Sequence, residues 1–412
     1  MVDKIAVLLS CYPRMSETFV AQELLGLEQA GLDIEIISLM RPETAQRQPV
    51  NDEIRAPVHY LPYSLLFDLP AFVAAWRRQR RQPNYAAALA VFRRDLRRDL
   101  TIGRIRRFAQ ALVVADRLAP RYSRLHANFM HKPATVADYV GLLTGLTWTC
   151  SAHAKDIWTE PEWNVREKLG RLEWAVTCTR HGFDRLRALA ADPTRVHFSY
   201  HGLDLTRFAP FAGSRPPRTG AEASDCLTLL AVGRVVPKKG FDTLLEALAL
   251  LPPELWWRLN HIGSGSEADM LKTAASRLGI ADRIAWLGTL DQGQVLDHYR
   301  AADLFVLPCR IAADGDRDGL PNVLVEAASQ RLAMVSTTVS AIPELIRDGT
   351  EGLLVPPADP ARLAAALLRL ARDPGLREML GRNAERRVRA EFDHRGSIAF
   401  LMALFEGRRA AA

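Results

Sequence analysis

The sequence DGDRDGLPNVLVEAASQ at residues 314–330 follows an apolar run at residues 303–308 that is typical of a buried strand. Within it, Pro321 suits the first position of a helix, and Gly319 lets the backbone come close to a ligand. A strand, a glycine-containing loop and a helix in this order form part of a βα unit, so the stretch predicts a parallel sheet.

The start of this predicted helix is suited to an anion. Its unpaired amides and its dipole favour a phosphate close to residues 319–322. Glu326 lies five residues beyond Pro321, which is about 7 Å along a helix axis. We therefore expect a nucleotide diphosphate, with its phosphates at the helix start and its ribose hydroxyls at Glu326. The alternative is an amphipathic core helix preceded by a solvated acidic loop.

The remaining chain repeats the strand-and-helix alternation. Residues 4–10 and 33–39 read as strands on either side of a helix at residues 16–30, a βαβ opening that again predicts a parallel sheet. The first turn has no G-x-G-x-x-G motif, which disfavours a dinucleotide-binding dehydrogenase. Residues 209–225 are rich in Pro, Gly and Ser and read as a linker. We expect an N-terminal domain at residues 1–208, a C-terminal domain at residues 226–392 and a helix at residues 393–412.

Composition supports a soluble globular protein. The 412 residues suit two domains, and 48% are hydrophobic and 25% charged. No apolar run approaches the length of a membrane span, and the first residues do not resemble a signal peptide. The five cysteines are scattered through mostly apolar runs, which indicates buried thiols in a reducing cytoplasm.

Positive charge is concentrated in one region. The net charge is 54 − 47 = +7, and residues 77–107 hold eleven arginines against two aspartates. The preceding residues 65–76, LLFDLPAFVAAW, are apolar. Together, residues 65–107 suit an anionic membrane surface. Nucleic acid is disfavoured because no binding motif is present. Helices with solvated arginine faces remain the alternative.

The stretch at residues 314–330 resembles the E-x7-E element of glycosyltransferase family 4, whose members are retaining enzymes with the GT-B fold. Glu326 takes the place of the second Glu, and Asp318 that of the first, one methylene shorter. The resemblance implies that Glu326 holds the ribose and that Asp318 lies against the donor sugar. It also implies an α/β fold of two Rossmann-like domains whose parallel sheets face an interdomain cleft. In such relatives the C-terminal helix crosses back to the first domain.

Three other segments are similar to family elements. In GRVVPKKGFDTLLEAL, Arg234 and Lys239 match a pair that clamps the donor diphosphate. In SAHAKDIW, His153 matches a residue over the donor sugar and Asp156 one that supports its loop. SETFV, beginning at Ser16, resembles the first-loop signature of bacterial exopolysaccharide transferases. Individually, these residues could equally be surface charges, a satisfied polar side chain or helix caps.

The resemblance therefore implies four groups of site residues. The catalytic set is Arg234, Lys239, His153 and Asp318; the donor-binding set is Gly233, Gly263, Leu287, Gly319, Leu320, Pro321, Asn322, Val323 and Glu326; the acceptor side has Ser16, Glu17, Thr18 and Asp156, with His126 and His131 as weaker candidates; Glu344 supports the donor loop.

The implied activity is transfer of a hexose-type sugar from a UDP- or GDP-sugar to a hydroxyl of a glycan or lipid-linked acceptor, in exopolysaccharide or cell-surface polysaccharide biosynthesis. We expect a cytoplasmic enzyme, peripheral at the inner membrane face. We expect no metal, although Asp314 and Asp316 spell a D-x-D motif, because the cationic pair supplies the countercharge. The alternatives are a catalytically weak nucleotide-sugar-binding scaffold and an epimerase.

Overall fold

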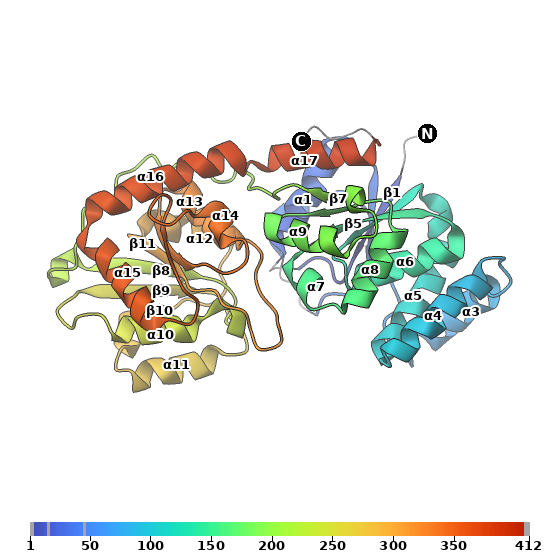
Figure 1. Ribbon diagram of the computed structural model, residues 1–412, viewed down its shortest axis with the longest axis horizontal. Helices are drawn as coiled ribbons and strands as arrows, with labels where there is room; N and C mark the ends of the chain where they lie inside the picture. Colours follow the sequence, from blue (N-terminus) through green and yellow to red (C-terminus); the bar gives the residue numbers. More distant parts are fainter. Residues whose placement is uncertain (1–3, 15–16, 44–46, 408–412) are drawn as a thin grey trace. The chain divides into compact units, whose positions relative to one another are not determined.

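The computed structural model describes residues 4–14, 17–43 and 47–407, and the chain divides into two compact units (Figure 1). Unit 1 contains the chain up to Cys178, Gly182–Ser199 and the residues from Ile398 onward. Unit 2 contains Thr179–His181 and Tyr200–Ser397. Each unit has its own hydrophobic core.

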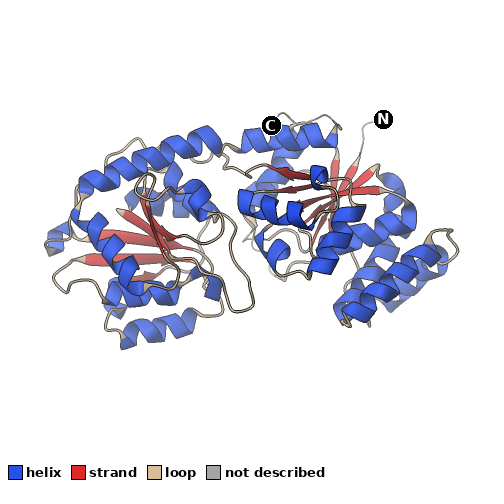
Figure 2. Cartoon of the chain, viewed as in Figure 1, coloured by secondary structure: helices blue, strands red, loops and turns tan. Residues whose placement is uncertain are grey.

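Unit 1 is built on a parallel sheet, as the βαβ opening predicted. Among the described residues it has seven strands in the order β3-β2-β1-β4-β5-β6-β7. The strands are β1 (Ile5–Leu9), β2 (Ile34–Ser38), β3 (Val58–Tyr60), β4 (Arg124–Asn128), β5 (Thr147–Ala152), β6 (Ala175–Thr177) and β7 (Val196–Phe198). All five residues of β1 and of β2 are buried, because helices cover both faces of the sheet (Figure 2).

The helices of unit 1 mostly alternate with these strands. They are α1 (Thr18–Gln29), α2 (Val50–Glu53), α3 (Leu69–Gln79), α4 (Tyr85–Arg98), α5 (Ile102–Arg117), α6 (Lys132–Thr144), α7 (Ala154–Trp158), α8 (Glu162–Arg171) and α9 (Arg180–Leu189), whose first two residues belong to unit 2. The arginine-rich region predicted from composition forms α3, α4 and α5, which stand together at one side of unit 1 (Figure 1).

Unit 2 is a second parallel α/β unit. Its described residues form six strands in the order β10-β9-β8-β11-β12-β13. The strands are β8 (Leu227–Val232), β9 (Trp257–Ile262), β10 (Ile284–Trp286), β11 (Leu304–Leu307), β12 (Ala333–Thr337) and β13 (Leu353–Val355). The helices are α10 (Phe241–Ala249), α11 (Ala268–Arg277), α12 (Gln292–Ala301), α13 (Asn322–Ser329), α14 (Ile342–Leu345), α15 (Pro360–Arg372) and α16 (Pro374–Glu391). The strand order reverses between β8 and β11, the position where such sheets bind ligands at the carboxyl ends of their strands.

The chain passes into unit 2 earlier than the sequence indicated. Leu203 and Phe208, which we assigned to the N-terminal domain, are buried in the core of unit 2. Arg215, in the expected linker, donates hydrogen bonds to the backbone carbonyls of Tyr299, Ala302, Gln330 and Arg331. Residues 200–225 therefore belong to unit 2 through apolar packing and backbone hydrogen bonds that composition does not reveal.

The last helix, α17 (His394–Phe405), returns the chain to unit 1 at Ile398. There Ile398, Leu401, Leu404 and Phe405 pack in a cluster with Trp174. No helix in the described part of the chain has both the length and the apolar character that crossing a membrane requires.

Candidate functional site

The candidate donor site of unit 2 begins in the loop after β8. Gly240 has φ 67° and precedes α10, and a Cβ at this position would lie 2.1 Å from the carbonyl oxygen of Pro308. Only glycine allows this approach, because the left-handed conformation and the contact both exclude a side chain. The loop after β8 is thereby held against the end of β11, which brings Lys239 close to the residues that precede α13.

Four charged side chains meet at this point. The Nζ of Lys239 lies 2.7 Å from Oδ2 of Asp318, and the Nζ of Lys238 lies 3.1 Å from Oδ1 of the same carboxylate. Lys238 also pairs with Asp316 at 3.1 Å. The sequence analysis did not include Lys238 among the site residues. The sequence Pro237-Lys238-Lys239 could have indicated a tight turn that carries both lysines.

This grouping shifts the pKa of both main partners. Burial opposes ionisation of Asp318, but the charges of Lys239 and Lys238 outweigh it and hold the pKa of the carboxyl below its usual range. Burial also disfavours the charged form of Lys239, yet Asp318 raises the pKa of that lysine overall. The site therefore keeps buried, ionised groups of both signs at neutral pH. The neighbouring Cys309 thiol, 3.6 Å from Asp318, has a pKa raised by burial to about 12 and stays protonated.

Arg234 is placed differently from its predicted partner. Its side chain is exposed and makes no hydrogen bond or ion pair with the described residues. Its positive charge nevertheless opposes the upward shift in the pKa of Lys239, so the two cations interact. Arg234 is thus a solvent-facing cation beside the buried Lys239.

Helix α13 starts where the sequence indicated, within one residue. Pro321 is the N-cap, Asn322 is the first helical residue, and no side chain caps the helix. Pro321 is buried, whereas Gly319, Leu320, Asn322 and Val323 are half-buried. The uncapped first turn provides backbone amides and a positive dipole end for an anion.

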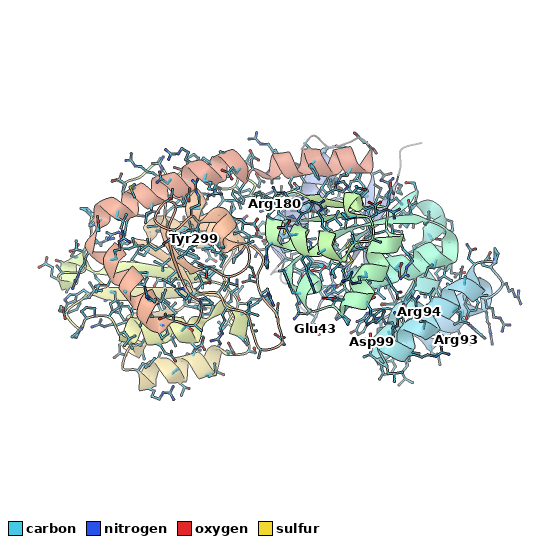
Figure 3. The ribbon with its side chains drawn as sticks, in the orientation of Figure 1. Glu43, Arg93, Arg94, Asp99, Arg180 and Tyr299 are labelled. Atoms are coloured by element: carbon cyan, nitrogen blue, oxygen red, sulfur yellow. The ribbon has the colours of Figure 1, made fainter. Side chains whose placement is uncertain are left out.

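Glu326 is the acidic group that we expected at the ribose. It is half-buried on α13, and the hydroxyl of Tyr299 donates a hydrogen bond of 2.9 Å to its Oε2. Burial raises the pKa of Glu326 to about 7, although Tyr299 and the charge of Lys239 lower it. Tyr299, labelled in Figure 3, also donates to the carbonyl of Val323 at 3.3 Å. Tyr299 fixes the carboxylate, and no motif pointed to it.

The turns after β9 and β10 complete this edge of unit 2. Gly263 has φ 134°, and a Cβ there would lie 2.0 Å from the carbonyl oxygen of Gly233. The Gly263 amide donates to the carbonyl of Gly288 at 2.7 Å, and the Leu287 amide to that of His261 at 2.9 Å. The backbone of Gly263 therefore lies directly against the loop after β8 at Gly233. In this structure Gly233 and Gly263 pack these two turns together.

In unit 1, His153 and Asp156 form the start of α7. His153 is the N-cap, and its Nε2 lies 2.8 Å from Oδ1 of Asn128. Asp156 is buried and accepts hydrogen bonds from the backbone amides of His153, at 2.9 Å, and Met130. Burial raises the pKa of Asp156 to about 7 even though these amides lower it. This arrangement gives Asp156 a supporting position in the loop that carries His153.

The first-loop residues lie at the start of α1. Glu17 is the N-cap and pairs with Arg14 at 2.8 Å, and Thr18 is the first helical residue. No side-chain hydrogen bond from the N-cap residue caps α1. Ser16 lies outside the described residues.

The weaker candidates are also placed. His126 is fully buried, with Nδ1 2.8 Å from Thr149 Oγ1, and burial lowers its pKa to about 4. Glu344 accepts hydrogen bonds from the backbone amides of Arg180 and His181 and from the Tyr200 hydroxyl, all within unit 2.

Comparison with known proteins identifies part of unit 2. Residues 226–373 match the family described as Glycosyl transferases group 1. They belong to that family. This range contains the Lys239–Asp318 pair, α13 and Glu326, so the candidate donor site lies within the glycosyltransferase domain.

Curated relatives cover different shares of this chain. WcaL of Salmonella typhimurium, a glycosyltransferase named for colanic acid biosynthesis, is 27% identical over 98% of this chain and 99% of its own. AmsK of Erwinia amylovora, named for amylovoran biosynthesis, is 34% identical over 41% of this chain and 42% of its own.

Solved structures confirm the fold. Sucrose-phosphate synthase from Thermosynechococcus elongatus superposes with a TM-score of 0.72 at 18% identity, covering 98% of each chain. Anabaena HepE, solved with UDP and glucose, gives a TM-score of 0.69 at 15% identity over 98% of this chain and 99% of that one. The two parallel-sheet, Rossmann-like units are those of the GT-B fold. The family match of residues 226–373 and the similarity to WcaL over nearly the whole chain support a glycosyltransferase.

Proposed function

We propose that this glycosyltransferase is a retaining enzyme that moves a hexose-type sugar from a UDP- or GDP-sugar to a hydroxyl of a glycan or lipid-linked acceptor. The observation that supports this most strongly is the grouping of Lys239, Asp318 and Glu326 around the uncapped start of α13. Cations, free amides and a carboxylate at that spacing match the phosphates and ribose of a nucleotide diphosphate.

Lys239 and the α13 amides bind the diphosphate in this proposal. As the bond between the sugar C1 and the phosphate oxygen breaks, negative charge grows on the departing diphosphate. Lys239 and the exposed Arg234 stabilise that charge more in the transition state than in the bound donor. In this proposal Asp318, which pairs with two lysines, orients Lys239 and contacts the donor sugar.

Glu326 binds the ribose hydroxyls through its carboxylate, which Tyr299 keeps in one orientation. Retention then needs no protein nucleophile. The acceptor oxygen attacks C1 on the face that the diphosphate leaves, and the acceptor proton passes to the departing phosphate oxygen. On the unit 1 side, we propose that His153 contacts the donor sugar while Asp156 supports its loop, and that the first loop, Ser16 to Thr18, serves the acceptor.

The proposal includes no metal cofactor. Lys239 and Arg234 provide the countercharge that a divalent cation provides in other transferases. In the D-x-D motif, Asp316 is already paired with Lys238 at 3.1 Å. Addition of EDTA should therefore leave the transfer rate unchanged.

The proposed pathway is exopolysaccharide or cell-surface polysaccharide assembly. Support comes from the names of WcaL and AmsK, and the UDP in the HepE structure makes UDP-sugars the first donors to test. We also propose a cytoplasmic location at the inner membrane face. Large apolar side chains are exposed beside the arginines of α3–α5, among them Leu66, 75% exposed, and Phe67, 85% exposed.

The test is a thermal-shift panel of nucleotide sugars, followed by measurement of hydrolysis and transfer with the donor that binds. A raised melting temperature with one donor, and sugar transfer from it with the anomeric configuration kept, would support the enzyme. Donor binding without turnover across a broad acceptor panel would instead support the scaffold alternative.

The membrane part is tested separately by flotation with phosphatidylglycerol liposomes at low salt. Phosphatidylcholine liposomes are the control, because they lack the negative charge that the arginines would bind. Flotation only with the anionic liposomes is expected, and no flotation with either would reject the membrane surface.

A further inference from the structure

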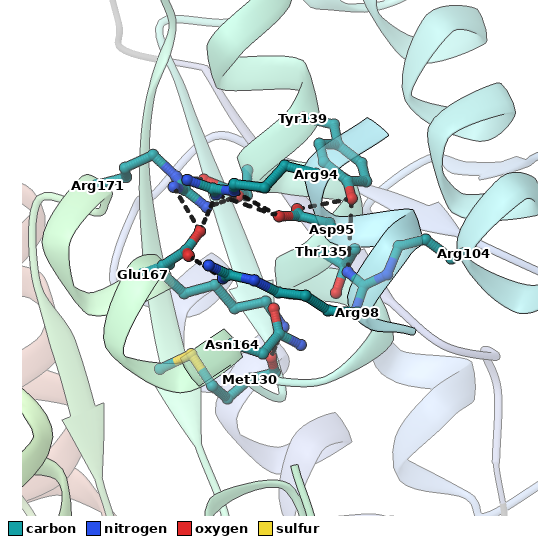
Figure 4. A network of polar contacts seen from close by, with 12 residues as sticks. Arg94, Asp95, Arg98, Arg104, Met130, Thr135, Tyr139, Asn164, Glu167 and Arg171 are labelled. Carbon is teal, nitrogen blue, oxygen red and sulfur yellow. Dashed lines mark hydrogen bonds and ion pairs between the residues drawn. The ribbon is translucent and has the colours of Figure 1, made fainter. Parts of the chain in front are cut away.

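The arginines and lysines of unit 1 differ in whether a carboxylate neutralises them. Arg94 and Arg98 both pair with Glu167, and Arg171 pairs with Asp138 at 2.6 Å (Figure 4). Arg104 pairs with Asp99 at 3.0 Å. The pairs with Glu167 link α4 to α8, and the Arg171–Asp138 pair links α8 to α6. These arginines therefore have a structural role, which is to hold helices together.

A second set has no such role. The side chains of Arg106, Arg107 and Lys132 make no ion pair or hydrogen bond with any residue that the structure describes. Arg106 lies over the ring of Tyr63 at 4.1 Å, but its Nε is buried and has no hydrogen-bond partner. Burial without a partner is costly for a guanidinium nitrogen, so a partner from outside the described chain would stabilise it.

These cations gather at one edge of the sheet with two others. Arg14 follows β1, Lys132 is the first residue of α6 after β4, and Lys155 lies in α7 after β5. Strands β1, β4 and β5 are neighbours in the sheet, and the strand order reverses between β1 and β4. The three residues therefore lie at adjacent carboxyl ends, where α/β sheets bind ligands.

Charge interactions place the other four side chains near Lys132. Partial desolvation lowers the pKa of Lys132, and the charges of Arg107, Arg14, Arg106 and Lys155 lower it further. Two acidic groups lie nearby: Glu17 pairs with Arg14 of this group, and Glu160 lies 3.8 Å from the buried Lys168. We call Arg14, Arg106, Arg107, Lys132 and Lys155 the cationic cluster.

The backbone at the cluster also favours an anion. Helix α6 has 13 residues, and its N-cap, His131, makes no side-chain capping bond. The amides of His131 and Lys132 have no acceptor among the described residues, and the Nδ1 of His131 is buried without a partner. Uncapped amides, a helix dipole and the unpaired side chains of Arg106, Arg107 and Lys132 together form an anion site.

We propose that the cationic cluster, with the start of α6, binds a phosphate or diphosphate group of the acceptor. The inference rests on the proposed function, because it assumes that unit 1 receives the acceptor. Next to Arg106 and Arg107, α5 exposes Ile102 and Ile105, and Leu100 just before it is 83% exposed. An apolar chain attached to the phosphate would cover these side chains, so the surface suits a lipid-linked phosphate as well as a soluble one.

The test is calorimetric titration of the full chain with inorganic pyrophosphate. All proteins carry Arg234→Gln, which weakens competing binding at α13. The test variant adds Arg107→Gln and Lys132→Gln. The control adds Arg117→Gln, which removes one positive charge at the other end of α5, about 15 Å along the helix from Arg107.

The double substitution should raise the dissociation constant at least about tenfold, because each charge-assisted hydrogen bond to an anion is worth that much. The Arg117→Gln control should stay within about twofold. Equal affinity of the test variant and its parent, or no binding to the parent, would overturn the proposal. If the double variant does not fold, Lys132→Gln alone replaces it, because this substitution changes an exposed side chain. This single substitution must also weaken binding.

Two further arms separate the possible sources of phosphate and the two proposals. Tighter binding of farnesyl diphosphate than of pyrophosphate, with the gain lost in Ile102→Ser/Ile105→Ser, would identify a lipid-linked acceptor; equal binding would identify a soluble one. Thermal shift of the unsubstituted chain with UDP-glucose reports on the donor site of unit 2. Loss of that shift with pyrophosphate binding intact would reject the proposed donor, not the cationic cluster.

Discussion

At the residue scale, the candidate donor site depends on the buried ammonium of Lys239. Asp318 keeps this ammonium charged although Lys239 is buried. One oxygen of Asp318, Oδ2, contacts Lys239, and the other, Oδ1, contacts Lys238. Removing Lys239 therefore leaves Asp318 with one cationic partner, so the local charge balance is weakened but not lost.

Lys239→Ala should lower the turnover number by about 100-fold or more, because one lost donor to a developing charge costs that much. The protein should still fold, since Lys238 continues to neutralise Asp318. Turnover and urea unfolding measure the two effects. Lys272→Ala, on the exposed face of α11, is the control; near-normal turnover of Lys239→Ala would reject its role as a diphosphate clamp.

Affinity for a nucleotide sugar should fall as the pH drops below 7. Burial raises the pKa of Glu326 from 4.5 to about 7, so acid converts it to a carboxylic acid that accepts ribose hydroxyls less well. The loss should approach tenfold per pH unit below the pKa. UDP-glucose is the suitable titrant because its phosphates do not titrate in this range.

Glu326→Gln should remove this pH dependence and provides the control. Protonation of Glu326 has the opposite effect on stability: it weakens donor binding but stabilises the fold. Because the folded-state pKa of Glu326 is above its unfolded value, its protonation stabilises the fold at low pH, and this contribution disappears as the pH rises through about 7. A pH profile of affinity that is the same in both proteins would exclude Glu326 from the ribose site.

The sequence identified Lys239, Asp318 and Glu326 because they stand close to predicted strand ends and a helix start. It did not identify Lys238 or Tyr299. Lys238 and Lys239 lie in one 3-10 turn, Pro237–Lys239, which buries both; in an extended chain, consecutive side chains would point to opposite sides. Tyr299 reaches Glu326 from α12, a contact between distant parts of the chain that no local pattern contains.

At the element scale, α10 is attached to the end of β11 through Gly240. Because Gly240 has no Cβ, it can adopt a left-handed backbone conformation and lie against the carbonyl of Pro308. Gly279 after α11 has a similar φ of 70°, but a methyl group there would have nothing within 4 Å. Substitution of Gly279 would therefore cost backbone strain alone, whereas substitution of Gly240 would cost backbone strain and a steric clash.

Gly279→Ala should lower the free energy of unfolding by about 1–2 kcal/mol, the cost of a left-handed alanine. Gly240→Ala should lower it by more than twice that amount, because the new methyl group meets a backbone carbonyl. Urea unfolding measures both. Equal losses would show that the loop before α10 is not held against β11.

Element types were largely predictable from periodicity, whereas their assignment to units was not. The strand expected at residues 303–308 is β11 (Leu304–Leu307), and the helix expected after Pro321 is α13. Residues 200–208 follow a strand of unit 1 but pack in unit 2 through Leu203 and Phe208. The short β3 and α2 were not predicted, because three or four residues carry too little periodicity.

At the scale of the whole molecule, the chain starts in unit 1, builds unit 2 and returns through α17. The returning residues cover Trp174, whose ring centroid lies 5.1 Å from that of Phe405. The stability of unit 1 therefore depends on residues more than 200 positions away in the sequence.

A chain ending at Ser397 should lose several kcal/mol of unfolding free energy, since each buried apolar side chain contributes about 1.5–3 kcal/mol. Thermal unfolding measures the loss. A chain ending at Gly407 keeps α17 and is the control. If the shorter chain melted at the same temperature as this control, α17 would not be part of the core of unit 1.

The most direct test of the donor site is a crystal structure of the protein with UDP-glucose bound. We expect the diphosphate within about 3 Å of Lys239 Nζ and of the backbone amides of Gly319, Leu320 and Asn322, with the ribose hydroxyls at Glu326. A nucleotide bound away from Lys239, Glu326 and the start of α13 would contradict this assignment.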